Sequence, residues 1–189
     1  MLFRSPKTVD SPMQRAQQLK AAGDFAGART IVENELARDR ENIDLQTSLA
    51  ELQALDGDVD GARKELERLQ GSQPAHPAVK RLAALLAFSD VVAAHPDVRS
   101  LRERAAANPT DLDLKHALAV HQLLGGDVEP ALLAWLEILR DQRTYKEDLA
   151  RRSLVMAFEL IGEADPIVSQ TRRAMARMLF LYGDRKSVV

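Results

Sequence analysis

Apolar and small residues recur every three or four positions along most of this 189-residue chain, a period typical of amphipathic helices. This period predicts helix pairs over residues 12–22 and 25–38, 43–55 and 59–70, and 111–124 and 128–142. Between the second and third pairs a divergent unit has a long apolar helix over 78–94 and a shorter one after Asp97, and a last pair covers 146–161 and 165–181. No segment alternates between apolar and polar residues as a β-strand does, so the pattern predicts an all-α chain of about ten helices.

A short motif separates the two helices of three of these pairs. It reads Gly, Asp, an apolar residue, two variable residues and Ala, and its copies begin at Gly23-Asp24, Gly57-Asp58 and Gly126-Asp127. The first two copies are 34 residues apart, and the third follows after 69, close to two further periods. Glycine can end a helix in the left-handed conformation, and aspartate can accept hydrogen bonds from the free N–H groups of the next helix. The motif therefore predicts tight turns between antiparallel helices.

Small residues recur on both helices of each pair. One lies seven residues before each motif glycine and another lies five residues after it. These six positions are Ala16, Ala28, Ala50, Ala62, Ala119 and Ala131. Facing small residues let two helix backbones approach closely, so we expect closely packed pairs.

This spacing resembles the tetratricopeptide repeat. The small, glycine, alanine and proline positions of that repeat coincide with Ala50, Gly57, Ala62 and Pro74, whereas the other two copies carry arginine at the proline position. The resemblance implies a right-handed α-solenoid of antiparallel helix pairs, and we assign it to residues 9–182.

The order of the units resembles the C-terminal half of the bacterial thioredoxin-like co-chaperones of the YbbN/CnoX family, also called chaperedoxins. Two repeats precede the divergent unit, a third repeat opens at Asn108-Pro109, and a closing helix carries Arg172-Arg173. The resemblance implies that the parent protein has a thioredoxin-like domain ahead of the repeats. It also implies that the protein holds unfolded clients and passes them to the chaperonin.

The two ends of the chain look foreign to the repeat domain. We interpret residues 1–8 and 183–189 as tails, and we hypothesise that Leu2–Ser5 and the last residues are translated sequencing adapters. On this hypothesis the chain is a fragment of a longer protein. The alternative is two ordinary terminal tails.

Composition narrows the possible functions. The chain has 26 Lys and Arg residues against 28 Asp and Glu, a formal net charge of -2 and no Cys. This charge argues against a nucleic-acid binder, and the lack of Cys excludes thiol chemistry within the chain. No apolar run approaches the roughly 18 residues of a membrane helix, and no secretory signal begins the chain. We expect a soluble, cytoplasmic protein without a cofactor, a nucleic-acid partner or a membrane partner.

We find no catalytic or metal-binding pattern, and we expect that the chain is not an enzyme. His116 and His121 are five residues apart, so they cannot share a metal as an i,i+4 pair can. Carboxylates alternate with Lys and Arg, as on solvated helix faces. Trp135 occupies a position where the repeat has a large core residue.

The first helix of each pair lines the concave groove of a tetratricopeptide solenoid. By position, the groove candidates are Met13, Gln17, Thr47, Glu51, His116, Val120 and Leu123. They lack the Lys, Asn and Arg of the clamp that binds chaperone C-terminal carboxylates in one subfamily. The groove is therefore either a mixed, modestly apolar client surface or a solvated face without a ligand.

The last helix is a second candidate partner site, and its candidate residues are Arg172, Arg173, Arg177, Met178, Phe180 and Tyr182. By resemblance this helix would dock on the chaperonin. The alternative is that its methionines pack on the preceding helix while its arginines complement the negative helix end.

Together these observations predict a protein-binding module of a thioredoxin-like co-chaperone. Two other functions stay open, namely a scaffold that assembles one fixed complex and an accessory part of an enzyme whose activity lies wholly in a missing upstream domain.

Overall fold

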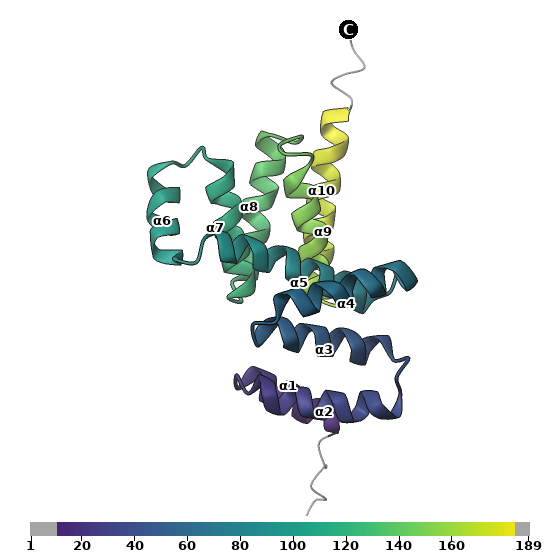
Figure 1. The fold of residues 1–189 in the computed structure, drawn as a ribbon. Helices are drawn as coiled ribbons and strands as arrows, with labels where there is room; N and C mark the ends of the chain where they lie inside the picture. The colour runs from purple at the N-terminus through teal and green to yellow at the C-terminus, as the bar shows by residue number, and fades with distance from the viewer. Residues whose placement is uncertain (1–10, 184–189) are drawn as a thin grey trace, which may run out of the picture. The chain divides into compact units, whose positions relative to one another are not determined.

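The computed structural model describes residues 11–183, and it describes side chains as far as Phe180. Every regular element in this range is helical, which confirms the all-α prediction (Figure 1). The ten helices of the described range are α1 Pro12–Ala21, α2 Phe25–Arg38, α3 Ile43–Leu55, α4 Val59–Ser72, α5 Pro77–Ala94, α6 Val98–Ala107, α7 Leu112–Leu124, α8 Val128–Asp141, α9 Leu149–Ile161 and α10 Pro166–Gly183. None of these helices is both long and apolar enough to cross a lipid bilayer.

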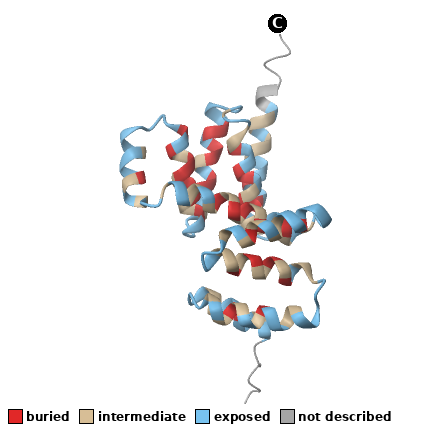
Figure 2. Cartoon of the chain, viewed as in Figure 1, coloured by how far each residue is buried: buried red, intermediate tan, exposed pale blue. Residues whose placement is uncertain are grey.

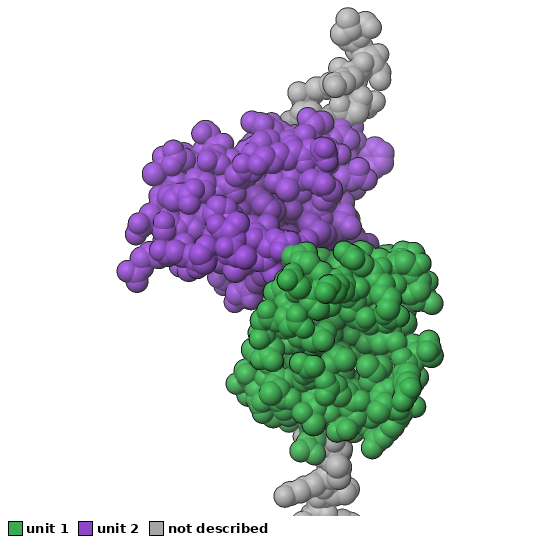
Figure 3. Space-filling model, in the orientation of Figure 1, with its two compact units in different colours: residues 1–86 green, residues 87–189 purple. Residues whose placement is uncertain are grey.

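The chain forms two compact units, residues 1–86 and 87–189 (Figure 3). In the first unit α1 packs on α2, α2 on α3 and α3 on α4. The first half of α5 adds Leu82 and Leu86 to a cluster with Ala50 and Ala62. The first unit therefore consists of the helix pairs α1–α2 and α3–α4 and of the first half of α5, which packs against the second pair.

The second unit has a larger core around Trp135. In this unit α6 packs on α7, α7 on α8, α8 on α9, and α10 on α8. The core joins Phe88 of α5 to Trp135, Leu154, Phe158 and Val168. Figure 2 shows the buried residues as stripes on the helices, as expected for amphipathic helices that share a core.

The motif glycines end their helices as predicted. Gly23, Gly57 and Gly126 have φ values of +81°, +101° and +91°, which lie in the region that disfavours residues with a Cβ atom. The six predicted alanines are all buried, at 4% exposure or less. Both halves of the repeat prediction, the turn and the close helix contact, are therefore confirmed.

Two of the three motif aspartates cap the next helix. The carboxylate of Asp24 accepts the N–H of Gly27 at 2.8 Å, and that of Asp58 accepts the N–H of Gly61 at 2.9 Å. Asp127 makes no such bond, which corrects the prediction for the third copy. The residue three positions after Asp127 is Pro130, and proline has no N–H to donate.

The start of α9 also differs from the prediction. The helix begins at Leu149 instead of residue 146, because Lys146, Glu147 and Asp148 have φ values of 44°, 56° and 62°. These left-handed conformations cannot continue a right-handed helix. The ammonium of Lys146 contacts both carboxylate oxygens of Asp113, at 2.7 and 2.6 Å. This ion pair holds the loop between α8 and α9 against α7.

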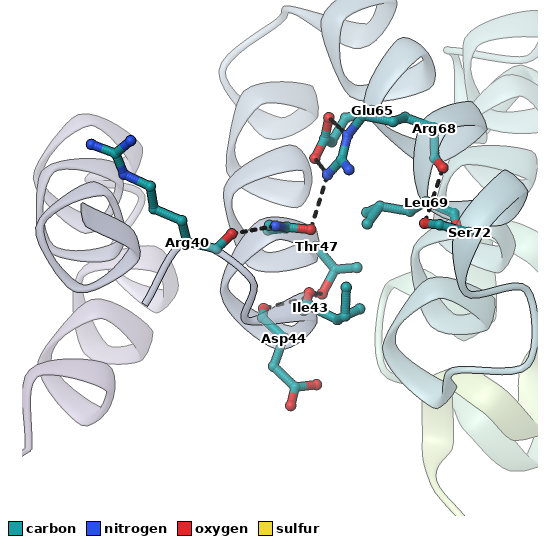
Figure 4. Close-up of polar contacts among 9 residues, drawn as sticks. Arg40, Ile43, Asp44, Thr47, Glu65, Arg68, Leu69 and Ser72 are labelled. Carbon is teal, nitrogen blue, oxygen red and sulfur yellow. Dashed lines mark hydrogen bonds and ion pairs between the residues drawn. The ribbon is translucent and has the colours of Figure 1, made fainter. Parts of the chain in front are cut away.

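A polar network ties the α2–α3 connection to α4 (Figure 4). The side chain of Gln46 donates to the carbonyl of Arg40 at 2.5 Å and accepts from the guanidinium of Arg68 at 2.9 Å. The same guanidinium pairs with Glu65 at 2.5 Å. The network holds three consecutive segments in a fixed register on the surface of the first unit.

Candidate functional site

Four of the seven predicted groove residues lie around one cavity in the first unit. Met13 and Gln17 come from α1, Thr47 and Glu51 come from α3, and the first half of α5 supplies further lining. On each helix the two residues are four positions apart and share a face. The cavity has a volume of about 200 Å³. We call this cavity and its lining residues the first-unit groove.

Local capping fixes where the two groove helices begin. The hydroxyl of Ser11 accepts the N–H of Gln14 at 3.2 Å, and the side chain of Gln14 accepts the N–H of Ser11 at 2.7 Å. On α3 the side chain of Asn42 accepts the N–H of Leu45 at 3.1 Å. Because each cap sets the first turn, it also sets which residues of the helix face the groove.

The floor of the first-unit groove is apolar. Its buried members are Ala16, Val32, Leu52 and Leu82. Thr47 is also buried, and its hydroxyl already donates to the carbonyls of Ile43 and Asp44, at 2.9 and 3.0 Å (Figure 4). Thr47 therefore has no unused hydroxyl proton for a ligand, and the floor offers mainly apolar contact.

The rim of the groove is polar and mixed in charge. The ammonium of Lys20 pairs with the carboxylate of Glu51 at 3.0 Å, which links α1 to α3. Gln17, Asp44 and Arg81 also lie on the rim, and none of the three side chains is hydrogen-bonded or ion-paired within the described range. The rim thus presents one satisfied ion pair and three groups with free polar atoms.

The size of the cavity restricts what it can hold. Sites for small molecules and cofactors usually measure about 300–1,000 Å³. A dry cavity of about 150 Å³ holds one benzene molecule. At about 200 Å³ the first-unit groove fits one large side chain, and it is small for a cofactor.

The other three groove candidates lie in the core of the second unit. Val120 is 0% exposed, Leu123 is 7% exposed and His116 is 9% exposed. The prediction that they line a groove is wrong, because α7 packs against both α6 and α8 and because Phe88 belongs to the same core. These three residues stabilise the second unit and are not available to a partner.

His116 accepts a hydrogen bond in this core. The indole N–H of Trp135 donates to its Nδ1 at 3.0 Å, and the ring of Phe88 stacks on the indole with centroids 5.6 Å apart. Burial lowers the pKa of His116 to about 4. The imidazole is therefore neutral at physiological pH, and Trp135 is the core residue that the repeat pattern predicts.

The last helix has an inward and an outward face. Its inward face packs on the core of the second unit with Val168, Met175, Met178 and Leu179. Its outward face carries Arg173, Arg177 and Phe180, which are four and three residues apart. Phe180 is 80% exposed. We call these three residues the outward stripe of α10.

The remaining candidates on α10 do not belong to this stripe. Arg172 pairs with Glu163, and its guanidinium lies 5.0 Å from the centroid of the Phe158 ring. Met178 packs inward, as the alternative interpretation expects. The side chain of Tyr182 lies outside the described residues. Docking of α10 on a partner stays a prediction, and it now rests on the outward stripe.

Sequence reasoning missed three rim residues, Lys20, Asp44 and Arg81. Lys20 could have been found, because it is seven residues after Met13 and therefore lies on the same helix face. Arg81 could not, because the divergent unit lacks the motif that sets the register of the other pairs. Within residues 11–183, no three His, Asp or Glu side chains lie close enough together to hold a metal ion.

Comparisons with known proteins support the repeat architecture. Two tetratricopeptide-repeat family models match the chain, one over residues 19–86 and the other over residues 92–180. Uncharacterized proteins of Mycobacterium tuberculosis and Mycobacterium bovis are 28% identical over 163 residues, which is 84% of this chain and 50% of each relative. The chain thus spans about half the length of the curated relatives it matches.

Among solved structures, a domain of a Vibrio parahaemolyticus protein of unknown function is 20% identical to the chain, with a TM-score of 0.40. The match covers 88% of this chain and 96% of that domain.

Proposed function

Because tetratricopeptide repeats occur in both units of the chain, we propose that it is a protein-binding module that takes up extended segments of partner proteins in the first-unit groove. One observation carries this proposal, namely a cavity with an apolar floor and a rim on which the side chains of Gln17, Asp44 and Arg81 have free polar atoms. An extended peptide can use both features, since its apolar side chains can be buried on the floor and its backbone N–H and C=O groups can form hydrogen bonds with the rim.

The dimensions of the groove favour weak and reversible binding. Complete burial of one Leu or Phe side chain contributes about 1.5–3 kcal/mol, and immobilising the peptide offsets part of this gain. A single such contact gives low affinity and little sequence selectivity. Low affinity suits a protein that must release its partners.

The resemblance to chaperedoxins refines the proposal. We infer that the partners are unfolded clients, and that the outward stripe of α10 docks on the chaperonin to which clients pass. The stripe supports this role because it is exposed, cationic and aromatic at the same place. The thioredoxin-like domain of the parent protein is part of this proposal, and so is a cytoplasmic location.

Light scattering of a thermally unfolding test protein measures the client-holding activity. We expect the intact chain to slow aggregation, and we expect Gln17→Arg, which adds bulk and charge at the rim, to weaken this effect. Gln70→Arg is the matched control, because Gln70 is an exposed residue of α4 outside the groove. Circular dichroism verifies that both variants fold.

The same experiment separates this proposal from a fixed scaffold. A scaffold would leave aggregation unchanged and would retain one stoichiometric partner in a pull-down. Equal effects of the Gln17 and Gln70 variants would contradict a role of the groove.

A further inference from the structure

We infer that the first-unit groove selects peptides that carry one apolar side chain and a single nearby side-chain carboxylate, and that Arg81 determines this selectivity. The inference rests on the proposed function and names the chemistry of its partner. The inference follows from a comparison of the polar groups on the rim. Only a group without a partner in the protein can bind a ligand without first losing an internal hydrogen bond or ion pair.

Most polar groups around the cavity are already satisfied. The hydroxyl of Ser48 donates to the carbonyl of Asp44 at 2.7 Å, and the Thr47 hydroxyl is likewise bonded to backbone carbonyls. Lys20 and Glu51 neutralise each other at 3.0 Å. A ligand carboxylate that approached Lys20 would meet a cation whose charge is already neutralised, and it would be repelled by the carboxylate of Glu51.

Arg81 is the remaining cation on the rim. It lies on the exposed side of α5, and it forms no ion pair within residues 11–180. A guanidinium presents paired N–H donors that match the two oxygens of a carboxylate. A peptide without an acidic side chain can satisfy Arg81 only with a carbonyl oxygen, which binds a cation more weakly.

Asp44 limits the number of ligand carboxylates that the groove can bind. Its side chain lies on the same rim and has no ion pair within the described range. With Lys20 and Glu51 paired, the unpaired charges of the rim are one cation and one anion. A second ligand carboxylate would meet Asp44 and be repelled. The groove therefore favours one acidic group beside an apolar residue over an acidic cluster.

The volume of the cavity agrees with a single apolar anchor. About 200 Å³ above a floor of Ala16, Leu52 and Leu82 holds one leucine-sized or phenylalanine-sized side chain. We assign the carboxylate to a side chain within the partner segment, because one free guanidinium, that of Arg81, matches a single carboxylate and the lining does not include the set of Lys, Asn and Arg residues that would hold a chain terminus.

Chemical-shift titration of the intact, ¹⁵N-labelled chain tests the inference, because it detects weak binding and locates it. The probes are two acetylated and amidated decapeptides of Gly and Ser with a central Leu-Glu or Leu-Gln. A third probe carries Leu-Gln and a free C-terminal carboxylate. We expect the Leu-Glu peptide to shift amides around Gln17 and Thr47 and to bind about five-fold more tightly than the Leu-Gln peptide at low salt.

Two variants isolate the contribution of Arg81. We expect Arg81→Gln to remove the preference for Glu over Gln while leaving the binding of the Leu-Gln peptide unchanged. Lys80→Gln makes the same change of charge at the neighbouring exposed residue, which is outside the cavity lining, and should keep the preference.

Each outcome is decisive. Equal binding of the two amidated peptides, or a preference that survives Arg81→Gln, overturns the inference but leaves peptide binding in place. Preference for the free C-terminal carboxylate over the side-chain carboxylate overturns the assignment to an internal segment. No shift around the groove with any peptide overturns both the inference and the proposed function.

Discussion

Protonation of His116 should destabilise the second unit. The indole N–H of Trp135 donates to Nδ1 of His116 at 3.0 Å, so this nitrogen must carry a lone pair. Protonation places hydrogen on both ring nitrogens and removes that acceptor. Because Trp135 is fully buried, its N–H would then lose its only partner within the described range.

The size of the effect follows from the pKa. Burial lowers the pKa of His116 from 6.5 to about 4, and repulsion from Lys146 and His95 adds to this, while attraction to Asp113 opposes it. Between these two pH values the unfolded chain binds a proton that the folded chain does not bind. The free energy of unfolding therefore falls as the pH drops from 6.5 to 4, by about 3 kcal/mol in total. The stabilisation is fully present above pH 6.5.

Urea unfolding followed by tryptophan fluorescence measures this effect. The chain has one Trp, so the emission reports the second unit. We expect the urea midpoint to fall markedly between pH 6.5 and 4.5. His116→Gln retains an oxygen acceptor but does not titrate, so it should be less stable at pH 7.5 and much less sensitive to pH.

The difference between the two proteins isolates His116, because all other titrating groups are common to both. An unchanged pH slope in His116→Gln would refute the reasoning. It would mean that carboxylates such as Asp113, whose pKa is lowered mainly by its hydrogen bond to Lys146, cause the acid sensitivity.

Three further predictions concern the turns and the last helix. Asp58→Ala should lower the free energy of unfolding by about 1 kcal/mol because it removes a cap, whereas Asp127→Ala should cost only a few tenths, as circular dichroism and fluorescence can measure. Glu147→Gly should raise the free energy of unfolding by about 0.5–1 kcal/mol, seen as a higher Tm, because glycine adopts the φ of 56° without strain. Arg177→Glu combined with Phe180→Ser should leave the Tm unchanged and reduce capture by the chaperonin, because both residues are exposed on the outward stripe. Met178→Ala should lower the Tm, because Met178 packs on the core. Retained capture by the double variant would contradict docking by the outward stripe.

The repeat motif predicted the fold because its physics is local. A glycine with positive φ, a following helix and a buried alanine five residues later all depend on neighbours within two helical turns. Gly23, Gly57 and Gly126 therefore have the predicted conformation, and the adjoining helix ends lie within two residues of the predicted ones. The absence of a cap at Asp127 was also predictable, since Pro130 is visible in the sequence.

Contacts between distant residues account for the errors. Residues 146–148 were compatible with a helix, yet Lys146 pairs with Asp113, which is 33 positions earlier. The position of Arg81 on the rim depends on how the divergent unit packs, and no motif specifies that packing. The local pattern predicts which residues are helical, whereas tertiary contacts decide which helix faces remain exposed.

The second and third copies of the repeat motif show how one helical repeat can border a groove in one unit and a core in the other. A shift of 69 residues aligns Thr47 with His116 and Glu51 with Val120. Glu51 needs water or a partner, and it has both at the edge of the first-unit groove, whereas Val120 is fully buried. The carboxylate of Glu51 in the first unit is thus replaced by the apolar side chain of Val120 in the second, and the position changes from the edge of a groove to a core. The polarity of the first-helix residues, more than the repeat motif itself, therefore indicates which unit has a cavity and which has a core at these positions.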